Sequence, residues 1–276
     1  MNIPLDPEFS YSCRMRDPHT TGNGNTGWTE AHCEPSAPSL DPNGYDYVAR
    51  QAIFDQMGVI YGYELLFRPG SQNHCTGTSD TATRTMVGNS LLRGLDGLTA
   101  SFPSFVNCTR EALVGRWVSL LPRTTTVLEL VETVRADEDV VNACRNLKEM
   151  GYAIALDDFE FSSNMESLLE LADYVKIDFR VPEKQRRETL RELKSTQATL
   201  VAEKIETEEE LRIAFDEGFQ LFQGFFLEAP RVFSRRKSAE ASPQARLLKA
   251  ITAFWPEAQE HDDAAGEPRC FRSAIA

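Results

Sequence analysis

The sequence predicts an α/β fold, a modified (β/α)8 barrel of the TIM type in which one strand runs antiparallel to its neighbours. Short segments rich in Val, Ile and Leu alternate with segments of helical periodicity, which is typical of parallel strands buried on both faces. The length of 276 residues accommodates one barrel of about 250 residues with short tails. No GxGxxG turn follows a predicted strand, since the single match, at residues 22–27, lies in the polar N-terminal segment, and no GxxxxGK[ST] turn is present, so a closed barrel is favoured over an open, doubly wound sheet.

The first two strands are expected at residues 47–54 and 60–67, joined by a short turn as an antiparallel hairpin. Apolar residues at helical spacing then predict a helix over residues 81–98. The other strands are expected at residues 105–107, 126–131, 153–157, 174–177, 199–202 and 220–222. Together these segments supply the strands of an eight-stranded barrel.

Helices are expected between the later strands, at residues 109–120, 137–150, 163–171, 183–194 and 207–217. Gly151 directly follows one of them, as a C-cap glycine does. Two other helices begin with the capping-box pattern, Ser163-x-x-Glu166 and Thr207-x-x-Glu210.

Composition divides the chain into three parts. Residues 1–43 are rich in Pro, Gly, Ser, Thr and Asn and have no hydrophobic periodicity, so we expect a disordered N-terminal arm. Residues 44–232 are expected to form the barrel domain. Residues 233–276 are expected to form the remnant of a helical linker and a polar tail.

The charge of the chain limits its partners. Its 29 basic and 42 acidic residues give a net charge of −13, which argues against binding to duplex nucleic acid or to an anionic membrane surface. The sequence shows no apolar run of membrane-spanning length and no secretory signal. Its six cysteines are scattered, so we expect a cytoplasmic protein with reduced thiols.

Polar residues lie at or near the C-terminal ends of the predicted strands. A barrel brings these ends to one rim, so the following side chains are expected to meet there: Glu64, Asn107, Glu129, Asp157, Asp158, Lys176, Glu203 and Gln223. One such carboxylate alone would usually cap the next helix, but five converging acids repel one another unless cations neutralise them. The candidate ligands are oxygens and include no His, which predicts Mg²⁺ or Mn²⁺.

The adjacent Asp157 and Asp158 favour two metal ions, an arrangement that activates water for attack on phosphorus. Lys176 in the same ring has two interpretations. It either orients that water or neutralises developing charge, or it forms a salt bridge to an acid such as Asp178, which would still leave it at the rim.

The motifs around these residues resemble, in order and spacing, those of EAL-type cyclic-di-GMP phosphodiesterases. The resemblance covers about residues 45–230. Its motifs are Tyr-Glu-Leu-Leu-Phe-Arg at 63–68, Val-Asn-Cys-Thr at 106–109, Leu-Glu-Leu-Val-Glu at 128–132, Asp-Asp-Phe at 157–159, Val-Lys-Ile-Asp at 175–178, Ala-Glu-Lys-Ile-Glu at 202–206 and Phe-Gln-Gly-Phe at 222–225. The start of the barrel is most similar to the subgroup with a C-terminal HDOD domain, which we expect to be missing here.

The resemblance implies hydrolysis of cyclic-di-GMP to linear pGpG with two divalent cations, Mg²⁺ or Mn²⁺. It implies that one cation is held by Glu64, Asn107, Glu129 and Asp157. It implies that Asp157, Asp158 and Glu203 hold the other, with Asp157 bridging the two.

The resemblance also implies roles around the cations. The catalytic candidates are Lys176, which would contact the attacking water, Glu203 and the nearby Gln223. Arg68 would bind a substrate phosphate, and Glu132 would brace the loop after Asp158. A homodimer is implied as well.

Three departures from the family pattern favour alternatives. Leu65 replaces the signature alanine and is interpreted as a core residue, whereas Glu160 replaces a glycine and is either an extra ligand or a solvated loop acid. The loop at residues 161–164 is shorter and lacks the glycines that permit positive φ. The alternative functions are a catalytically silent cyclic-di-GMP sensor and a module that binds a regulatory protein partner.

Overall fold

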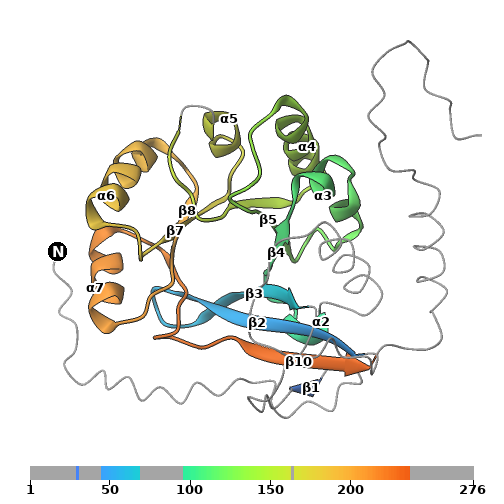
Figure 1. The fold of residues 1–276 in the computed structure, drawn as a ribbon, viewed down its shortest axis with the longest axis horizontal. Helices are drawn as coiled ribbons and strands as arrows, with labels where there is room; N and C mark the ends of the chain where they lie inside the picture. Colours follow the sequence, from blue (N-terminus) through green and yellow to red (C-terminus); the bar gives the residue numbers. More distant parts are fainter. Residues whose placement is uncertain (1–28, 31–44, 69–95, 163–164, 237–276) are drawn as a thin grey trace, which may run out of the picture. The chain divides into compact units, whose positions relative to one another are not determined.

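A computed structural model describes residues 29–30, 45–68, 96–162 and 165–236 (Figure 1). Eight strands of this part form a closed ring, because β2 pairs with β3 on one side and with β9 on the other. In ring order they are β2 (Tyr45–Asp55), β3 (Ile60–Arg68), β4 (Ser104–Cys108), β5 (Thr126–Leu130), β6 (Ala153–Leu156), β7 (Tyr174–Asp178), β8 (Thr199–Glu203) and β9 (Leu221–Phe222).

The orientation of the strands agrees with the sequence prediction. Strand β2 is antiparallel to both of its ring neighbours, and every other pair around the ring is parallel. The predicted modified (β/α)8 barrel with one antiparallel strand is therefore confirmed.

Two further strands extend the sheet beyond the ring. Strand β10 (Arg231–Arg236) pairs antiparallel with residues 45–50 of β2, and the short β1 (Thr29–Glu30) pairs with β10. Strand β1 lies within the predicted N-terminal arm, and β10 runs across the boundary predicted at residue 232. The division into arm, barrel and tail stays a prediction.

Helices surround the ring of strands on the outside, as Figure 1 shows. They are α2 (Asp96–Thr99), α3 (Arg110–Val114), α4 (Glu138–Glu149), α5 (Glu166–Leu169), α6 (Glu183–Glu192) and α7 (Glu208–Glu217). None of the helices in the described ranges is long and apolar enough to cross a membrane.

The helix predicted at residues 109–120 is wrong in part. Helix α3 ends at the C-cap Gly115, Arg116 adopts a left-handed conformation with φ of 58°, and a separate 3₁₀ helix covers Trp117–Leu120. A left-handed residue interrupts the helical hydrogen bonds, which accounts for the division.

Three other predicted helices differ in their limits. The one expected at residues 163–171 is the shorter α5, preceded by Met165, whose side chain makes no capping hydrogen bond, and Ser163 lies outside the described residues. Most of the helix expected at residues 81–98 also lies outside them. Helix α6 ends at Glu192 and is followed by a 3₁₀ turn, Leu193–Ser195.

Capping residues define the ends of α4 and α7. Asp137 caps α4 by accepting a hydrogen bond from the Val140 backbone, and Gly151 after α4 has a φ of +94°. Thr207 and Glu210 form the predicted capping box at the start of α7.

Two apolar regions sandwich the wall of the barrel. The larger one lies between the strands and the helices and includes Leu65, which is fully buried, so the interpretation of this residue as part of the core is confirmed. The smaller one contains Ile53, Phe105, Val127, Ala155, Val201 and Leu221, with Tyr61 and Tyr174 packed against it. These residues come from strands all around the ring and fill one end of its interior.

Candidate metal centre

The candidate site is a polar layer two residues beyond the small apolar cluster inside the barrel. Successive side chains of a strand point to opposite faces, so residues i and i+2 share the interior. Five of the apolar residues are accordingly followed by polar ones in the pairs Phe105 and Asn107, Val127 and Glu129, Ala155 and Asp157, Val201 and Glu203, Leu221 and Gln223. The small apolar cluster therefore ends where the polar layer begins, at the carboxyl ends of the parallel strands.

Lys176 is the central cation of this layer. It follows Tyr174 by two residues on β7, and its side chain is fully buried. Its Nζ forms ion pairs with four carboxylates: Glu203 Oε1 at 2.6 Å, Glu64 Oε2 at 3.3 Å, Asp157 Oδ1 at 3.3 Å, and Glu129 Oε1. The alternative partner Asp178 is not among these, so the salt-bridge interpretation holds with different acids.

Amide side chains hold Glu64 from both sides. Gln223 donates from Nε2 to Glu64 Oε2 at 2.7 Å, and Asn107 donates from Nδ2 to Glu64 Oε1 at 3.4 Å. Gln223 also donates to Gln51 Oε1 at 3.1 Å, and Gln51 projects into this layer from the antiparallel β2.

The glycine after Gln223 permits this arrangement. A Cβ on Gly224 would lie 2.1 Å from the backbone oxygen of Ile205 and 2.3 Å from its nitrogen, a distance that backbone atoms cannot accommodate. Ile205 in turn donates its backbone N–H to the oxygen of Gln223 at 3.1 Å. Only glycine lets the chain pass this closely beneath the end of β8.

Four buried oxygens of the layer have no hydrogen-bond partner: Asn107 Oδ1, Glu129 Oε2, Glu203 Oε2 and Gln223 Oε1. All four are acceptors, and buried acceptors without a partner are costly. Glu64, Glu129 and Glu203 also offer carboxylate oxygens that lie within 4.8 Å of one another. An all-oxygen set of this kind fits a hard divalent cation.

A second acidic group lies beside the first, formed by Glu132, Asp157 and Asp158, whose oxygens also lie within 4.8 Å of one another. Asp158 has a φ of +43°, a left-handed conformation that turns the chain directly after Asp157. Both carboxylate oxygens of Asp158 accept from Lys204 Nζ, at 2.7 and 3.0 Å.

The electrostatics of the buried layer favour additional positive charge. Burial raises the pKa of Glu129 and of Glu203 well above the usual value, and the attraction of Lys176 offsets only part of this effect. Burial lowers the pKa of Lys176, but the attraction of its four carboxylate neighbours is the larger effect. The net pKa is raised, so the ammonium stays charged. One ammonium among four acids leaves the layer short of positive charge, which a divalent cation would supply in place of protons.

A cavity of about 540 Å³ opens next to the second acidic group. Glu132, Asp157, Asp158 and Glu160 are among the residues that line it. The side chain of Glu160 is exposed and accepts from Gln185 Nε2 at 3.0 Å, and it belongs to neither acidic group. Of the two interpretations of Glu160, the solvated loop acid therefore agrees with the structure.

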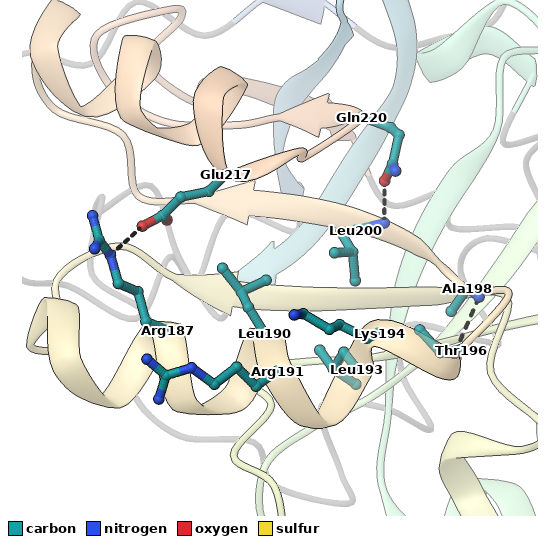
Figure 2. Close-up of a pocket in the computed structure, with 10 residues that line it drawn as sticks. All are labelled: Arg187, Leu190, Arg191, Leu193, Lys194, Thr196, Ala198, Leu200, Glu217 and Gln220. Carbon is teal, nitrogen blue, oxygen red and sulfur yellow. Dashed lines mark hydrogen bonds and ion pairs between the residues drawn. The ribbon is translucent and has the colours of Figure 1, made fainter.

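A second hollow, of about 440 Å³, lies between α6 and the start of β8 (Figure 2). Figure 2 shows Arg187 paired with Glu217, and Gln220 accepting from the backbone of Leu200 at 2.7 Å. Leu200 is near the start of β8, whereas Glu203 ends that strand, so this hollow contains none of the predicted site residues.

The structure brings most of the predicted site residues together. Glu64, Asn107, Glu129, Asp157, Lys176, Glu203 and Gln223 form one connected group around Lys176. Asp158 and Glu132 lie beside it. The backbone of Arg68 ends β3, but its side chain lies outside the described residues, and its predicted role stays a prediction.

Sequence reasoning missed Gln51 and Lys204. Gln51 precedes the inward-facing Ile53 by two residues on β2, so the alternation of that strand contained the signal. Lys204 reaches Asp158 through a left-handed backbone, with a φ of +57°, and nothing in the residue pattern indicates that conformation.

Comparison with protein families identifies this part of the chain. The family model of the EAL domain matches residues 103–230. These residues form an EAL domain. The match includes every strand from β4 to β9, which together position Asn107, Glu129, Asp157, Lys176 and Glu203.

Two curated relatives share more than a third of their aligned residues with this chain. An uncharacterized protein of Bacillus subtilis, YuxH, is 34% identical over an alignment of 196 residues that covers 68% of this chain and 48% of YuxH. The cyclic di-GMP phosphodiesterase CdgJ of Vibrio cholerae is 35% identical over 196 residues, 69% of this chain and 45% of CdgJ. The chain thus spans just under half the length of these relatives.

Solved structures share the fold of this EAL domain. BlrP1 of Klebsiella pneumoniae, in a complex with calcium and cyclic-di-GMP, matches with a TM-score of 0.56 and 22% identity, covering 75% of this chain and 60% of BlrP1. YkuI of Bacillus subtilis, in complex with cyclic-di-GMP and calcium, also matches with a TM-score of 0.56 and 22% identity, covering 76% of this chain and 60% of YkuI. At this identity the likeness supports the barrel fold.

Proposed function

We propose that the domain hydrolyses cyclic-di-GMP to linear pGpG with two divalent cations, Mg²⁺ or Mn²⁺. The observation that carries the proposal is the set of four buried, unpartnered oxygens on a rim that also presents Glu64, Asp157 and Asp158. The named activity of CdgJ and the cyclic-di-GMP in BlrP1 and YkuI support the choice of substrate.

Two ligand sets would hold the cations. The first contains Glu64, Asn107, Glu129 and Asp157, and two of its oxygens, Asn107 Oδ1 and Glu129 Oε2, are without a partner. The second contains Asp157, Asp158 and Glu203, whose Oε2 is also without a partner. When bound, the cations supply the positive charge that activates water and stabilises the charge that develops on the phosphate.

The chain's own residues orient this centre. Lys176 holds four carboxylates by ion pairs from one buried ammonium. It would also contact the attacking water. Gln223 and Asn107 fix the Glu64 carboxylate. Arg68 would bind a substrate phosphate, and Glu132 would brace the loop after Asp158.

The chemistry is a hydrolytic cleavage of one phosphodiester. An oxygen of water forms a new bond to phosphorus, the bond from phosphorus to the 3′ oxygen breaks, and that oxygen leaves with a proton as a hydroxyl group. One of the two phosphodiesters remains, so the ring opens to the linear dinucleotide.

A second candidate function is a sensor that binds cyclic-di-GMP without cleaving it. The observation in its favour is the ion pair between Lys204 and Asp158, which places an ammonium on an expected metal ligand. A module that binds a regulatory protein, and a homodimer, are also consistent with the sequence and stay predictions.

Turnover of cyclic-di-GMP tests the proposal. The purified chain is incubated with the dinucleotide and Mg²⁺ or Mn²⁺, and pGpG is followed by chromatography. We expect product from the wild type and at least about a hundredfold less from Glu64→Ala, because loss of a metal ligand removes charge stabilisation worth several kcal/mol. Glu149→Ala, an exposed acid at the end of α4, is the matched control and keeps activity.

Each outcome favours one function. Binding of cyclic-di-GMP without product in either metal supports the sensor and contradicts the enzyme. Absence of both binding and product leaves the protein-binding module. Circular dichroism of Glu64→Ala is the control that the variant is folded.

A further inference from the structure

Lys204 lies directly after β8 and has an unusual backbone. Its φ of +57° is left-handed, a conformation that glycine adopts freely, that Asn and Asp tolerate, and that costs energy in a residue such as lysine. Asp158, at the end of β6, is also left-handed, with a φ of +43°. The side chains of these two left-handed residues contact each other at the rim.

The ammonium of Lys204 is shared by two carboxylates. Its Nζ lies 2.7 and 3.0 Å from the two oxygens of Asp158, and 2.7 Å from Asp178 Oδ2. Its three close contacts are all to carboxylate oxygens, as expected for a charged ammonium. It therefore bridges the ends of β6, β7 and β8.

Lys204 is hydrogen-bonded to Asp158, the carboxylate that is proposed to bind the second cation. Asp158 offers two oxygens, and both already accept from the same ammonium. A divalent ion that binds Asp158 must replace this ammonium at one oxygen or both. The first ligand set has no such competitor at Asn107 Oδ1 or Glu129 Oε2, which are unpartnered.

We propose that Lys204 is a tethered cation that competes with the second divalent ion for Asp158, so that the two ions bind in sequence, the first tightly and the second weakly. This inference rests on the proposed function, because it uses the metal ligands assigned there. Lys204 is in this sense a positioning residue: it determines when Asp158 is available, and it does not itself contact the reacting phosphate.

Exposure makes the exchange feasible. The side chains of Lys204 and Asp158 are each 33% exposed, so the ammonium can move into water when a divalent ion arrives. Asp178 also pairs with Arg180 at 2.8 Å and therefore stays neutralised after Lys204 leaves. Lys176, by contrast, is fully buried.

Metal binding without nucleotide tests the inference. The chain is titrated with Mn²⁺ by calorimetry, and the number of bound ions is counted by electron paramagnetic resonance. We expect two sites in the wild type with clearly different affinities. In Lys204→Gly, which suits the left-handed backbone, the second site should tighten at least about tenfold, equivalent to about 1.4 kcal/mol, while the first changes little.

Three matched variants isolate the cause. Lys204→Arg keeps the tethered charge and should retain the weak second site. Lys204→Asn, which tolerates the same backbone, provides a second uncharged variant in case Lys204→Gly does not fold. Arg180→Gln removes a positive charge from the same acidic surface, but Arg180 donates to Asp178 and makes no hydrogen bond to Asp158 in the described structure, so the second site should change little.

The inference is overturned if the second-site affinity is the same in wild type and in the uncharged Lys204 variants. It is also overturned if Arg180→Gln tightens the site as much as Lys204→Gly does, because general charge would then be the cause. Either result leaves the phosphodiesterase proposal standing, since that proposal depends on the formation of pGpG.

Discussion

Two lysines lie on either side of the Asp157–Asp158 pair, and they occupy very different environments. Lys176 is inside the barrel on β7, fully buried, and it contacts four carboxylates. Lys204 lies just beyond β8, one third exposed, and it contacts two. Both are ammonium groups within acidic clusters, but the surrounding dielectric differs.

This difference separates a structural cation from an exchangeable one. A buried charge that loses its partners costs several kcal/mol, whereas an exposed pair contributes little because water solvates both ions. Lys176 is therefore expected to be required for the stability of the fold. Lys204 is expected to affect which ions the rim accepts and to contribute less to stability.

The largest effect is expected from Lys176→Met, which keeps the length of the side chain and removes its charge. Four carboxylates would then share a buried layer without a cation, so we expect the free energy of unfolding to fall by about 3–5 kcal/mol. The measurement is urea unfolding in the presence of a chelator, which removes the contribution of bound metal.

Lys148→Met is the matched control for this variant. Lys148 pairs with Asp173 at 2.7 Å, and both side chains are about one third exposed. Its loss should cost less than about 1 kcal/mol. If the two variants are equally stable, burial does not distinguish the two kinds of lysine, and the comparison fails.

The buried cluster was predictable from the sequence, whereas the exposed one was not. Period-two alternation in parallel strands places Asn107 beside Phe105 and Glu203 beside Val201 on the inner face, and the closed ring brings these residues together. The order of the strands follows from the hairpin and the alternating pattern. Both are properties of regular structure, which sequence periodicity records.

Lys204 depends on features that periodicity does not record. Its contact with Asp158 requires two left-handed residues other than glycine, at the ends of two different strands. The division of the helix predicted at residues 109–120 has the same origin, because Arg116 is also left-handed. Sequence reasoning was therefore least successful where a single backbone dihedral departs from the regular value.

The next largest effect is expected at Asp178, the second acid on Lys204. Partial burial raises the pKa of Asp178, but hydrogen bonds from Arg180 and Lys204 outweigh this effect. The net result is a pKa lowered from the usual 3.8 to about 2. A carboxyl whose pKa is depressed in the folded state stabilises the fold above its unfolded pKa, and this contribution is lost as the pH falls toward the folded value.

Asp178→Asn should therefore lower the free energy of unfolding by about 2 kcal/mol at pH 6, and by about half as much at pH 3. Urea unfolding of wild type and variant at a series of pH values measures this difference. A difference that stays constant from pH 6 to pH 3 would show that Asp178 stabilises the fold by packing and not by its charge.

The smallest effect is expected from Arg180→Gln. Arg180 donates to Asp178 from two nitrogens, but its side chain is 59% exposed. Solvent and salt screen such a pair, so we expect a loss of less than about 1 kcal/mol in the free energy of unfolding, and a smaller loss in 1 M salt. Arg191→Gln, an exposed arginine of α6, is the control for the loss of one surface charge and should change stability by less than about 0.5 kcal/mol.

This variant decides which cation neutralises Asp178. If Arg180→Gln costs as much as Asp178→Asn at pH 6, the exposed arginine carries the ion pair and Lys204 contributes little. If it costs much less, Lys204 is the main partner of Asp178, because it is the other side chain that donates to that carboxylate within the described residues. The contrast between the two lysines would then depend on burial alone, since each would be the principal cation of its own acidic cluster.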